Sequence, residues 1–285
     1  MPSVVANARL IANLVLERFA RSERPRVPEP MVMDDEMSVA AFHTADPILQ
    51  LPIYRFNALA MSALLPEGGS VLDLGSGSGR LLAHLAEARP DIRAVGTDLA
   101  ETMLATGRTS LEGVSLDERV ELRRADMTQL PADLPTDVDL VSTVWALHHL
   151  PTEEDLRRCV GEVARVREAS GCAVWIFDFA RLHRQATFEA IVALAPDAPQ
   201  RLREDGIASE RAAWSVGQLR DALAEAGLGD LQGGREGRIG HLQAYFAPAR
   251  DARPSGHAAH WSAPALPRAS DVFFRRVRAG MPSPT

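Results

Sequence analysis

One ten-residue segment constrains the fold of this chain more than any other, the run VLDLGSGSGR at residues 71–80. Its apolar start is typical of a buried parallel strand, three alternating glycines end that strand, and LLAHL then resumes with helical spacing. A strand, a tight glycine turn and a helix let backbone N–H groups approach a bound polar molecule closely. The spacing is G-x-G-x-G, which differs from the G-x-G-x-x-G of dinucleotide sites. Asp73, two residues before the first glycine, would repel a pyrophosphate and attract an ammonium or sulfonium group.

A second short strand, IRAVGTD at residues 92–98, ends in an acid. In nucleotide-binding folds an acid at this place, about 20 residues past the glycines, accepts hydrogen bonds from the ribose hydroxyls. The segments VLDLGSGSGR, VGTDLAETML, RRADMTQLP and DLVSTVWALHHL resemble, in this order, the successive motifs of class I S-adenosylmethionine (SAM)-dependent methyltransferases. They are similar to those of the broad bacterial small-molecule group. The resemblance covers residues 69–180 and implies that SAM is the cofactor.

The same resemblance implies a role for each motif residue. The three glycines would lie beneath the methionine and ribose of the cofactor, and Asp98 would bind the ribose hydroxyls. Leu99 and Met127 would lie on the two faces of the adenine, and Asp126 would accept a hydrogen bond from its amine. The alternative for Asp126 is a turn residue that bonds its own backbone. Trp145 either approaches the sulfonium or packs in the core. The predicted cofactor-binding residues are Asp73, Gly75, Gly77, Gly79, Asp98, Leu99, Asp126, Met127 and Trp145.

Strands and helices alternate from residue 70 onward, which predicts an α/β, Rossmann-like fold. We expect a seven-stranded, mostly parallel sheet with helices on both faces. The expected regions are a helical N-terminal cap at 1–67, a SAM-binding domain at 68–248 with an insertion at 181–214, and a Pro- and Ala-rich tail at 249–285. In the cap, Leu10, Leu14 and Val15 fall on one side of a predicted amphipathic helix. The cap and the insertion either open and close as a lid or pack permanently on the core.

The segment after the fourth predicted strand carries residues 145–149, WALHH, to the carboxyl edge of the sheet. Ligands of open α/β sheets bind at this edge. His148 or His149 is a candidate general base, because an imidazole changes charge near neutral pH. The alternative is a structural role in positioning the following helix. Tyr54 and Arg55, in the cap, could also reach the carboxylate of the cofactor. The residues that we expect to line the substrate site are His43, Tyr54, Arg55, Asp178 and His183.

We expect no metal site. A divalent-metal centre of the catechol-methylating type would require acids at the ends of the fourth and fifth strands, and the fourth strand ends in STVW at residues 142–145. Cys159 and Cys172, the two cysteines, lack the spacing of metal ligands and are interpreted as buried thiols. The formal net charge of −7 and the scattered arginines argue against a nucleic-acid partner.

The sequence therefore predicts a SAM-dependent methyltransferase that acts on a small molecule, with an O, N, S or C acceptor left open. Two alternatives remain. The chain could be a SAM-fold enzyme with non-methyl chemistry, or a non-catalytic SAM-binding partner subunit. The apolar stretch Leu10–Leu16 is too short to span a bilayer. We therefore expect no membrane partner and a cytoplasmic location, and a homodimer is compatible with the sequence.

Overall fold

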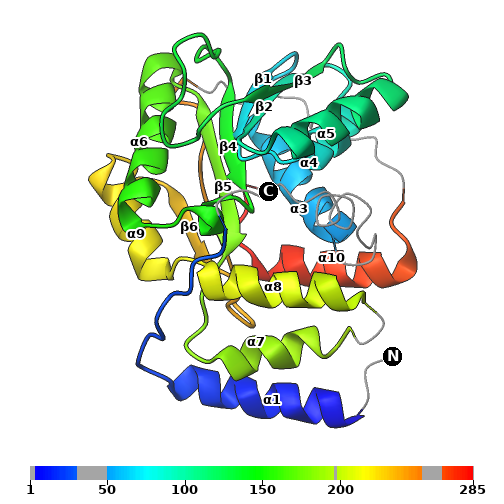
Figure 1. Cartoon of the computed structure of the whole chain (residues 1–285), viewed down its shortest axis with the longest axis vertical. Helices are drawn as coiled ribbons and strands as arrows, with labels where there is room; N and C mark the ends of the chain where they lie inside the picture. Colours follow the sequence, from blue (N-terminus) through cyan, green and yellow to red (C-terminus); the bar gives the residue numbers. More distant parts are fainter. Residues whose placement is uncertain (1–3, 31–49, 196–197, 252–264, 285) are drawn as a thin grey trace.

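The computed structural model of the chain describes residues 4–30, 50–195, 198–251 and 265–284. At its centre lies a seven-stranded sheet in the order β3-β2-β1-β4-β5-β7-β6 (Figure 1). The first five strands run parallel, β7 pairs antiparallel with β5, and β6 pairs antiparallel with β7. This arrangement confirms the predicted Rossmann-like fold. The strands are β1 (Ser70–Leu74), β2 (Arg93–Asp98), β3 (Val120–Arg124), β4 (Leu140–Val144), β5 (Ala173–Phe179), β6 (Gln232–Arg235) and β7 (Leu242–Ala247).

The tail predicted at 249–285 contains a helix, α10 (Arg268–Gly280), which the sequence did not predict. The helix that follows β2 extends to Gly113. The helix before β1 begins at Gln50 and includes Pro52, because the first turn of a helix tolerates proline. The helices are α1 (Val4–Phe19), α3 (Gln50–Leu64), α4 (Arg80–Ala88), α5 (Glu101–Gly113), the 3-10 turn η1 (Leu147–His149), α6 (Glu153–Ser170), α7 (Gln185–Val192), α8 (Gln200–Ala212), α9 (Val216–Glu225) and α10 (Arg268–Gly280).

The side chains of β5 divide the core into two layers. Trp175 and Phe177 pack in the cluster that α3 and α4 contribute to, while Val174 and Ile176 pack in the cluster that includes α6 and α9. This alternation follows from the two-residue period of a strand and confirms helices on both faces. The indole Nε1 of Trp175 donates a 2.8 Å hydrogen bond to Oδ1 of Asn57, so that α3 is fixed directly to the central sheet.

Helices α1, α7 and α8 stack one on another in the lower part of Figure 1. α8 also contacts η1, which places the stack beside the carboxyl edge of the sheet. The described parts of residues 1–67 therefore lie in two places, since α3 covers the sheet and α1 packs on α7. Leu10 and Leu14 are half-buried, but Val15 is 52% exposed, so its predicted place beside them was wrong. The buried residue of α1 is Glu17.

Glu17 joins α1 to the start of α7. Its carboxylate accepts hydrogen bonds from the backbone N–H of His183 (2.6 Å), the backbone N–H of Arg184 (3.0 Å) and the hydroxyl of Thr187 (3.0 Å). The first N–H groups of a helix have no partner within the helix, and a negative charge there is favourable. A buried carboxylate with three donors favours permanent packing of α1 over a mobile lid.

Replacing Glu17 with alanine should lower the free energy of unfolding by about 2–3 kcal/mol, because buried donors lose a charged acceptor. Urea unfolding measures the change. The matched control is Glu154→Gln, since Glu154 and Arg158 form an exposed pair with side chains 61% and 58% exposed. Such pairs contribute roughly 0–1 kcal/mol. Equal unfolding midpoints for the two variants would contradict the role of Glu17.

A histidine at the α3–α4 interface makes stability depend on pH. Nε of Arg55 donates to Nε2 of His84 at 3.3 Å. Burial, and then the nearby Arg55 charge, lower the pKa of His84 to about 4. The unfolded chain takes up this proton near pH 6.5 and the folded chain does not, so stability falls as the pH drops from about 6.5 towards 4.

When the pH is lowered from 7.5 to 5, the suppressed protonation of His84 should lower the free energy of unfolding of the wild type by about 2 kcal/mol. His84→Gln keeps a hydrogen-bond acceptor without the titration and should lack this part of the loss. Urea unfolding of both proteins at the two pH values measures the difference. The same pH dependence in both proteins would show that His84 is not the titrating group.

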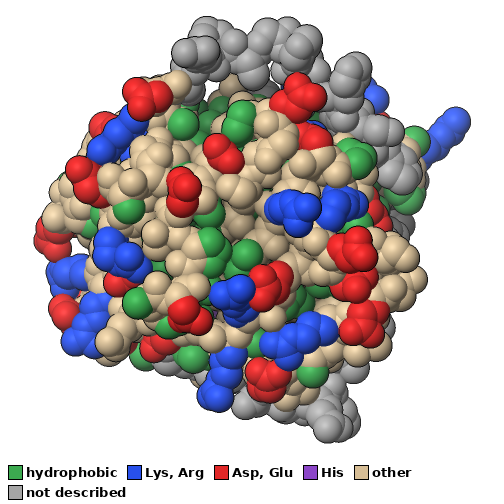
Figure 2. Space-filling model, turned by 90° about the horizontal axis from the view of Figure 1, so that it is seen from above, with side chains coloured by type: hydrophobic (Ala, Val, Ile, Leu, Met, Phe, Trp, Pro, Cys, Tyr) green, Lys and Arg blue, Asp and Glu red, His purple; other side chains and the backbone are tan. Residues whose placement is uncertain are grey.

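The surface seen in Figure 2 mixes both signs of charge, with acidic and basic side chains interspersed over that face. None of the helices in the described ranges has the length and apolar composition needed to cross a bilayer.

Candidate active site at the carboxyl edge of the sheet

The glycine loop between β1 and α4 has the conformation that its sequence predicts. Gly75, Gly77 and Gly79 have φ angles of 74°, 56° and 69°, a region that side chains disfavour. A Cβ on Gly75 would lie 2.3 Å from the Cβ of Ala146, so the loop and the segment after β4 touch directly. The N–H of Gly75 donates to the carbonyl oxygen of Thr97 at 2.8 Å, which ties the loop to β2.

Two carboxylates flank this loop. Oδ2 of Asp98 accepts a 2.8 Å hydrogen bond from the N–H of Gly77, and its Oδ1 accepts one of 2.9 Å from the N–H of Ala100. Oδ1 of Asp73 accepts a 2.6 Å hydrogen bond from the hydroxyl of Ser142 on β4. Burial raises the pKa of Asp73 to about 7, while the Ser142 hydrogen bond opposes this rise. Both acids therefore lie where the motif predicts them, within the structure of the loop.

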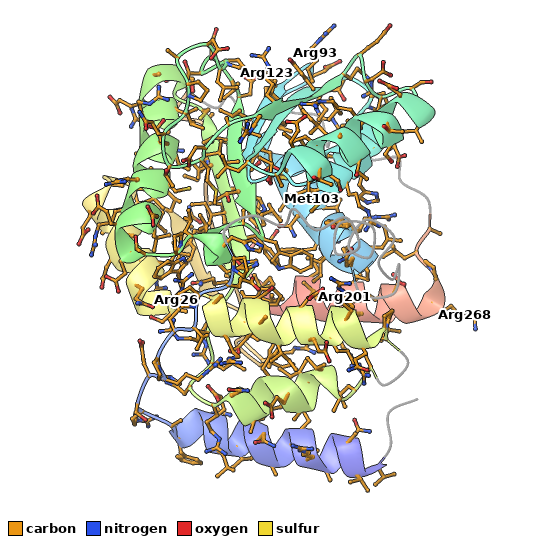
Figure 3. All side chains as sticks on the ribbon, viewed as in Figure 1. Arg26, Arg93, Met103, Arg123, Arg201 and Arg268 are labelled. Atoms are coloured by element: carbon orange, nitrogen blue, oxygen red, sulfur yellow. The ribbon has the colours of Figure 1, made fainter. Side chains whose placement is uncertain are left out.

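Two methionines lie against the loop. Sδ of Met127 is 3.5 Å from the position that a Cβ on Gly75 would take, and Cε of Met103 is 3.4 Å from that of Gly77. Met103, which the sequence analysis did not single out, is labelled on α5 in Figure 3. The loop thus has apolar walls from α5 and from the segment after β3.

The two remaining residues predicted at the adenine differ in their contacts. Leu99, directly after β2, is half-buried. Oδ1 of Asp126 accepts hydrogen bonds from the N–H (2.8 Å) and the hydroxyl (2.7 Å) of Thr128. This is the turn role that the sequence left open as the alternative for Asp126.

Trp145, directly after β4, has an unusual backbone conformation. Its φ of 55° lies in the left-handed region, which a bulky residue enters at a cost. Its ring stacks on Phe179 at 5.8 Å between centroids and meets Tyr54 edge-on at 6.1 Å. The indole Nε1 is buried and has no hydrogen-bond partner in the described part of the chain. Unpaired buried donors are rare, so the indole N–H of Trp145 is a donor that is available to a bound molecule.

Tyr54 and Arg55 point to different neighbours. The guanidinium of Arg80 lies 5.3 Å from the centre of the Tyr54 ring, and it donates to Oε1 of Gln50 at 2.9 Å. Arg55 instead contacts His84, as described above. Arg80, next to Gly79, is therefore a cation beside the glycine loop that the sequence analysis missed, although its place directly after the motif was a signal.

His148 is held by an acid from the neighbouring strand. Its Nδ1 lies 2.6 Å from Oδ1 of Asp178, and its backbone N–H donates to Oδ2 of Asp178 at 3.1 Å. Burial alone would lower the pKa of His148, but the charge and hydrogen bond of Asp178, with the charge of Glu29, raise it. The structure thus brings together two predicted site residues, and Nε2 is the ring nitrogen that faces away from Asp178.

Glu29 reaches this pair from the N-terminal segment. Its Oε1 lies 3.4 Å from Nε2 of His148 and 3.7 Å from Nδ1 of His149. Nδ1 of His149 is also 3.3 Å from the carbonyl oxygen of Pro30. Burial, and then the charge of His148, lower the pKa of His149. Sequence reasoning missed Glu29, because no local pattern links it to histidines so distant along the chain.

Arg26 fixes the turn that carries the histidines. Its guanidinium donates to three carbonyl oxygens of the η1 segment and one at the end of α8, and lies 3.8 Å from the centre of the Trp214 ring (labelled Arg26 in Figure 3). Nε1 of Trp214 donates to the carbonyl oxygen of Leu147 at 2.7 Å. The acceptors of Arg26 are the carbonyl oxygens of His148 (2.8 Å), Leu150 (2.6 Å), Pro151 (2.8 Å) and Ala212 (2.5 Å).

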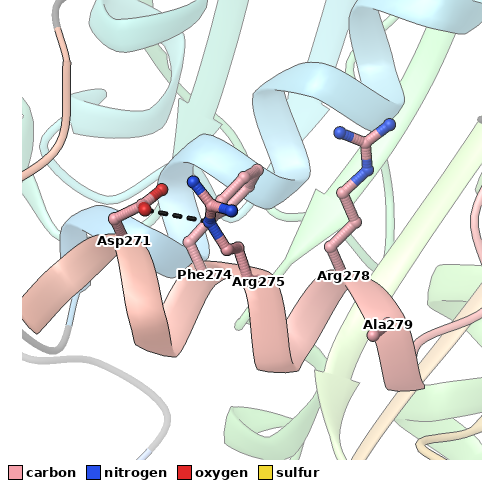
Figure 4. A pocket seen from close by; sticks show the side chains of 5 residues that line it. All are labelled: Asp271, Phe274, Arg275, Arg278 and Ala279. Carbon is pink, nitrogen blue, oxygen red and sulfur yellow. Dashed lines mark hydrogen bonds and ion pairs between the residues drawn. The ribbon is translucent and has the colours of Figure 1, made fainter. Parts of the chain in front are cut away.

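The last two residues predicted to line the substrate site, His183 and His43, are not found among the described contacts of His148. His183 lies before α7, with Nδ1 3.3 Å from the carbonyl oxygen of Ser22. His43 lies outside the described residues. A hollow of about 530 Å³ on α10, shown in Figure 4, is lined by Asp271, Phe274, Arg275, Arg278 and Ala279. None of these five residues belongs to the glycine loop or to η1.

Comparison with known proteins supports the motif assignment. The family model of a methyltransferase domain matches residues 71–171. The ubiquinone biosynthesis O-methyltransferase of Bordetella avium (strain 197N) is 27% identical over 213 residues, which cover 73% of this chain and 84% of that protein. The family match includes the glycine loop, strands β2, β3 and β4, and the histidine segment η1. Residues 71–171 of the chain are therefore a methyltransferase domain, and its motifs are those of the class I SAM-dependent type.

Two further similarities bear on the fold and on the range of relatives. A solved SAM-dependent methyltransferase from Aquifex aeolicus superposes with a TM-score of 0.53 at 20% identity, covering 75% of this chain and 97% of that one. The U6 snRNA (guanine-N(2))-methyltransferase of Mus musculus is 27% identical over 182 residues, or 58% of this chain. That match covers 34% of the mouse protein, so the chain spans about a third of that relative. This methyltransferase therefore uses SAM, and the glycine loop with its two carboxylates and apolar walls fits such a cofactor.

Proposed function

We propose that the protein transfers the methyl group of SAM to a small-molecule nucleophile, with His148 and His149 acting on the acceptor. The observation that carries this proposal is the buried His148–Asp178 pair, two residues beyond the contact between Ala146 and Gly75. The same short segment thus touches the cofactor loop and presents an oriented imidazole. The named activity of the Bordetella relative, O-methylation in ubiquinone biosynthesis, supports a small-molecule acceptor.

Each residue around the loop would bind a different part of the cofactor. Asp98 would hold the ribose hydroxyls, Asp73 the ammonium group, and the backbone of the three glycines the methionine and ribose. Leu99 and Met127 would enclose the adenine. The adenine amine would donate a hydrogen bond to Oδ2 of Asp126, the carboxylate oxygen that Thr128 does not use. The unpaired indole N–H and the ring of Trp145 would lie towards the reacting centre.

SAM supplies a methyl group that is already activated on a positively charged sulfur. What the chain must add is alignment of the acceptor and removal of its proton. Alignment alone is worth roughly 7–11 kcal/mol in favourable intramolecular reactions. Proton removal falls to the His148–His149 segment, where Asp178 fixes the ring of His148 and leaves Nε2 for the acceptor side.

A small molecule is a better acceptor than RNA for this surface. A protein that binds RNA or DNA neutralises phosphates with clustered Lys and Arg. The chain carries a formal net charge of −7, and Figure 2 shows both signs interspersed. The similarity to an enzyme of U6 snRNA covers 34% of that protein, so most of that enzyme has no counterpart in the match. We also expect the enzyme to work in the cytoplasm.

Replacing Asp98 with alanine should weaken SAM binding by about 10- to 100-fold, because hydrogen bonds to a charged acceptor are lost. Isothermal titration calorimetry with SAM and with S-adenosylhomocysteine measures the change. The matched control is Glu101→Gln, an exposed acid that pairs with Arg108 on α5. An unchanged dissociation constant in Asp98→Ala would remove Asp98 from the cofactor site.

Replacing His148 with asparagine should slow methyl transfer by about 100-fold or more, the usual range for loss of acid–base assistance, with SAM affinity preserved. Formation of S-adenosylhomocysteine is measured with a panel of O-, N-, S- and C-nucleophiles. Asp178→Asn should cause a similar loss of methyl transfer, since the ring of His148 would lose the carboxylate that fixes it. His84→Gln, on α4, serves as the control histidine variant. Full transfer by His148→Asn would mean that the histidine only positions η1.

A further inference from the structure

Among the described residues, three metal-ligating side chains converge at one place. Glu29, His148 and His149 each offer one ligand atom within 4.8 Å of the others, and the atoms that face Oε1 of Glu29 are Nε2 of His148 and Nδ1 of His149. We propose that these three atoms form a binding site for a divalent transition-metal ion such as Zn²⁺. The proposal rests on the proposed function and deepens it, because it specifies how the two histidines act on the methyl acceptor.

The distances suit an ion of this size. Zinc binds imidazole nitrogen and carboxylate oxygen at about 2.0–2.2 Å, so tetrahedral ligand atoms lie about 3.4 Å apart. In the structure, Oε1 of Glu29 is 3.4 Å from Nε2 of His148 and 3.7 Å from Nδ1 of His149. One ion can therefore reach all three atoms with small movements of the side chains.

A second, independent observation is an acceptor that lacks a donor. Oε1 of Glu29 is buried and has no hydrogen-bond partner within the described ranges, although Ser209 donates to the carboxylate. Buried carboxylate oxygens without partners are costly, and a cation at this position would remove the cost.

The surroundings of His148 are those of a metal ligand. Histidines that bind metals usually donate their other ring N–H to a carboxylate, which fixes the ring and its tautomer. Nδ1 of His148 lies 2.6 Å from Asp178, so Nε2 carries the lone pair in the neutral ring. Near the cluster lie two carboxylates, Glu29 and Asp178, and one guanidinium, that of Arg26, which leaves a negative balance for a cation.

One contact competes with the ion. Nδ1 of His149 lies 3.3 Å from the carbonyl oxygen of Pro30, which it meets as an N–H donor in the metal-free chain. This hydrogen bond is long, and giving it up for a metal–nitrogen bond costs little. To offer Nδ1 to the ion, His149 must move its ring proton from Nδ1 to Nε2, which is a change of tautomer.

The donor set also selects the metal. Two imidazoles and one carboxylate suit Zn²⁺, Co²⁺ or Ni²⁺, whereas Mg²⁺ and Ca²⁺ prefer oxygen ligands. From the sequence we expected no metal site, because the acids of a strand-end centre are missing. The proposed site departs from that expectation and uses other residues, Glu29, His148 and His149. Three protein ligands leave a fourth position open, as in catalytic zinc sites. A hydroxyl or thiol of the acceptor bound there would lose its proton to solvent water more readily, because the ion lowers its pKa. Its oxygen or sulfur would then form the new bond to the methyl carbon as the bond from that carbon to the sulfur of SAM breaks.

The experiment begins with the full chain stripped of metal by a chelator. Calorimetric titration with Zn²⁺ should show about one ion per chain, and Co²⁺ should give the absorption spectrum of a tetrahedral site. Glu29→Gln and His149→Asn should each weaken Zn²⁺ binding at least 10-fold. Asp178→Asn should weaken it by about 10- to 100-fold, the usual effect of a partner behind the ligand. Glu23→Gln, an exposed acid of the same segment, should bind Zn²⁺ as the wild type does.

SAM titration of each variant shows that it is folded, so loss of Zn²⁺ binding cannot be assigned to unfolding. Absence of stoichiometric Zn²⁺ and Co²⁺ binding to the wild type would overturn the site. Unchanged affinity in both Glu29→Gln and His149→Asn would do the same. Methyl transfer by the ion-free protein at the full rate would refute the role of the ion and leave the proposed function standing. Failure to bind SAM would remove the proposed function and leave the metal site standing.

Discussion

The half-buried guanidinium of Arg26 makes the contacts on which the arrangement of the candidate site depends. It donates to carbonyl oxygens of His148, Leu150, Pro151 and Ala212, and so joins the N-terminal segment, η1 and the end of α8. Only arginine offers five donors in a planar fork, and its flat face also lies on Trp214. Burial lowers the pKa of Arg26 to about 10, which still leaves the group charged at neutral pH.

Without these donors the turn would contain several buried carbonyl groups that have no partner. The turn after β4 is too short to satisfy them by itself, and Arg26 and Trp214 supply donors from segments distant in the sequence. The backbone of His148 is thereby fixed on one side, while Asp178 fixes its ring on the other. Because both the backbone and the ring of His148 are fixed, the imidazole need not rearrange when a ligand binds. Such preorganisation favours productive alignment of the reacting groups.

The parts of the site that the sequence predicted are those built within one local unit. The glycine loop and Asp98 are separated by 21 residues of a single strand–helix–strand segment, and their spacing alone predicts their contact. Arg26 contacts residues 122 to 186 positions away, and it lies in a proline-rich stretch that predicts only a loop. Glu17 was missed for a related reason. An acid on an amphipathic helix is expected to face water, and its partner, the start of α7, cannot be located from the pattern of α1. Asp126 shows a third limit, because a local turn and a ligand compete for the same carboxylate.

The contact between Ala146 and Gly75 fixes the glycine loop and the histidine segment relative to each other. Parallel pairing of β4 with β5 places Val144 beside Phe177, so Asp178 is the next residue at the edge of the sheet. The chain must then turn sharply at Trp145 to set Ala146 on the glycine loop and still return His148 to Asp178. The left-handed backbone of Trp145 makes that turn, at a cost that a bulky residue incurs only when its surroundings require it. The glycine loop and His148, the proposed cofactor and acceptor sides of the site, are therefore connected by four consecutive residues, and a shift of either one moves the other.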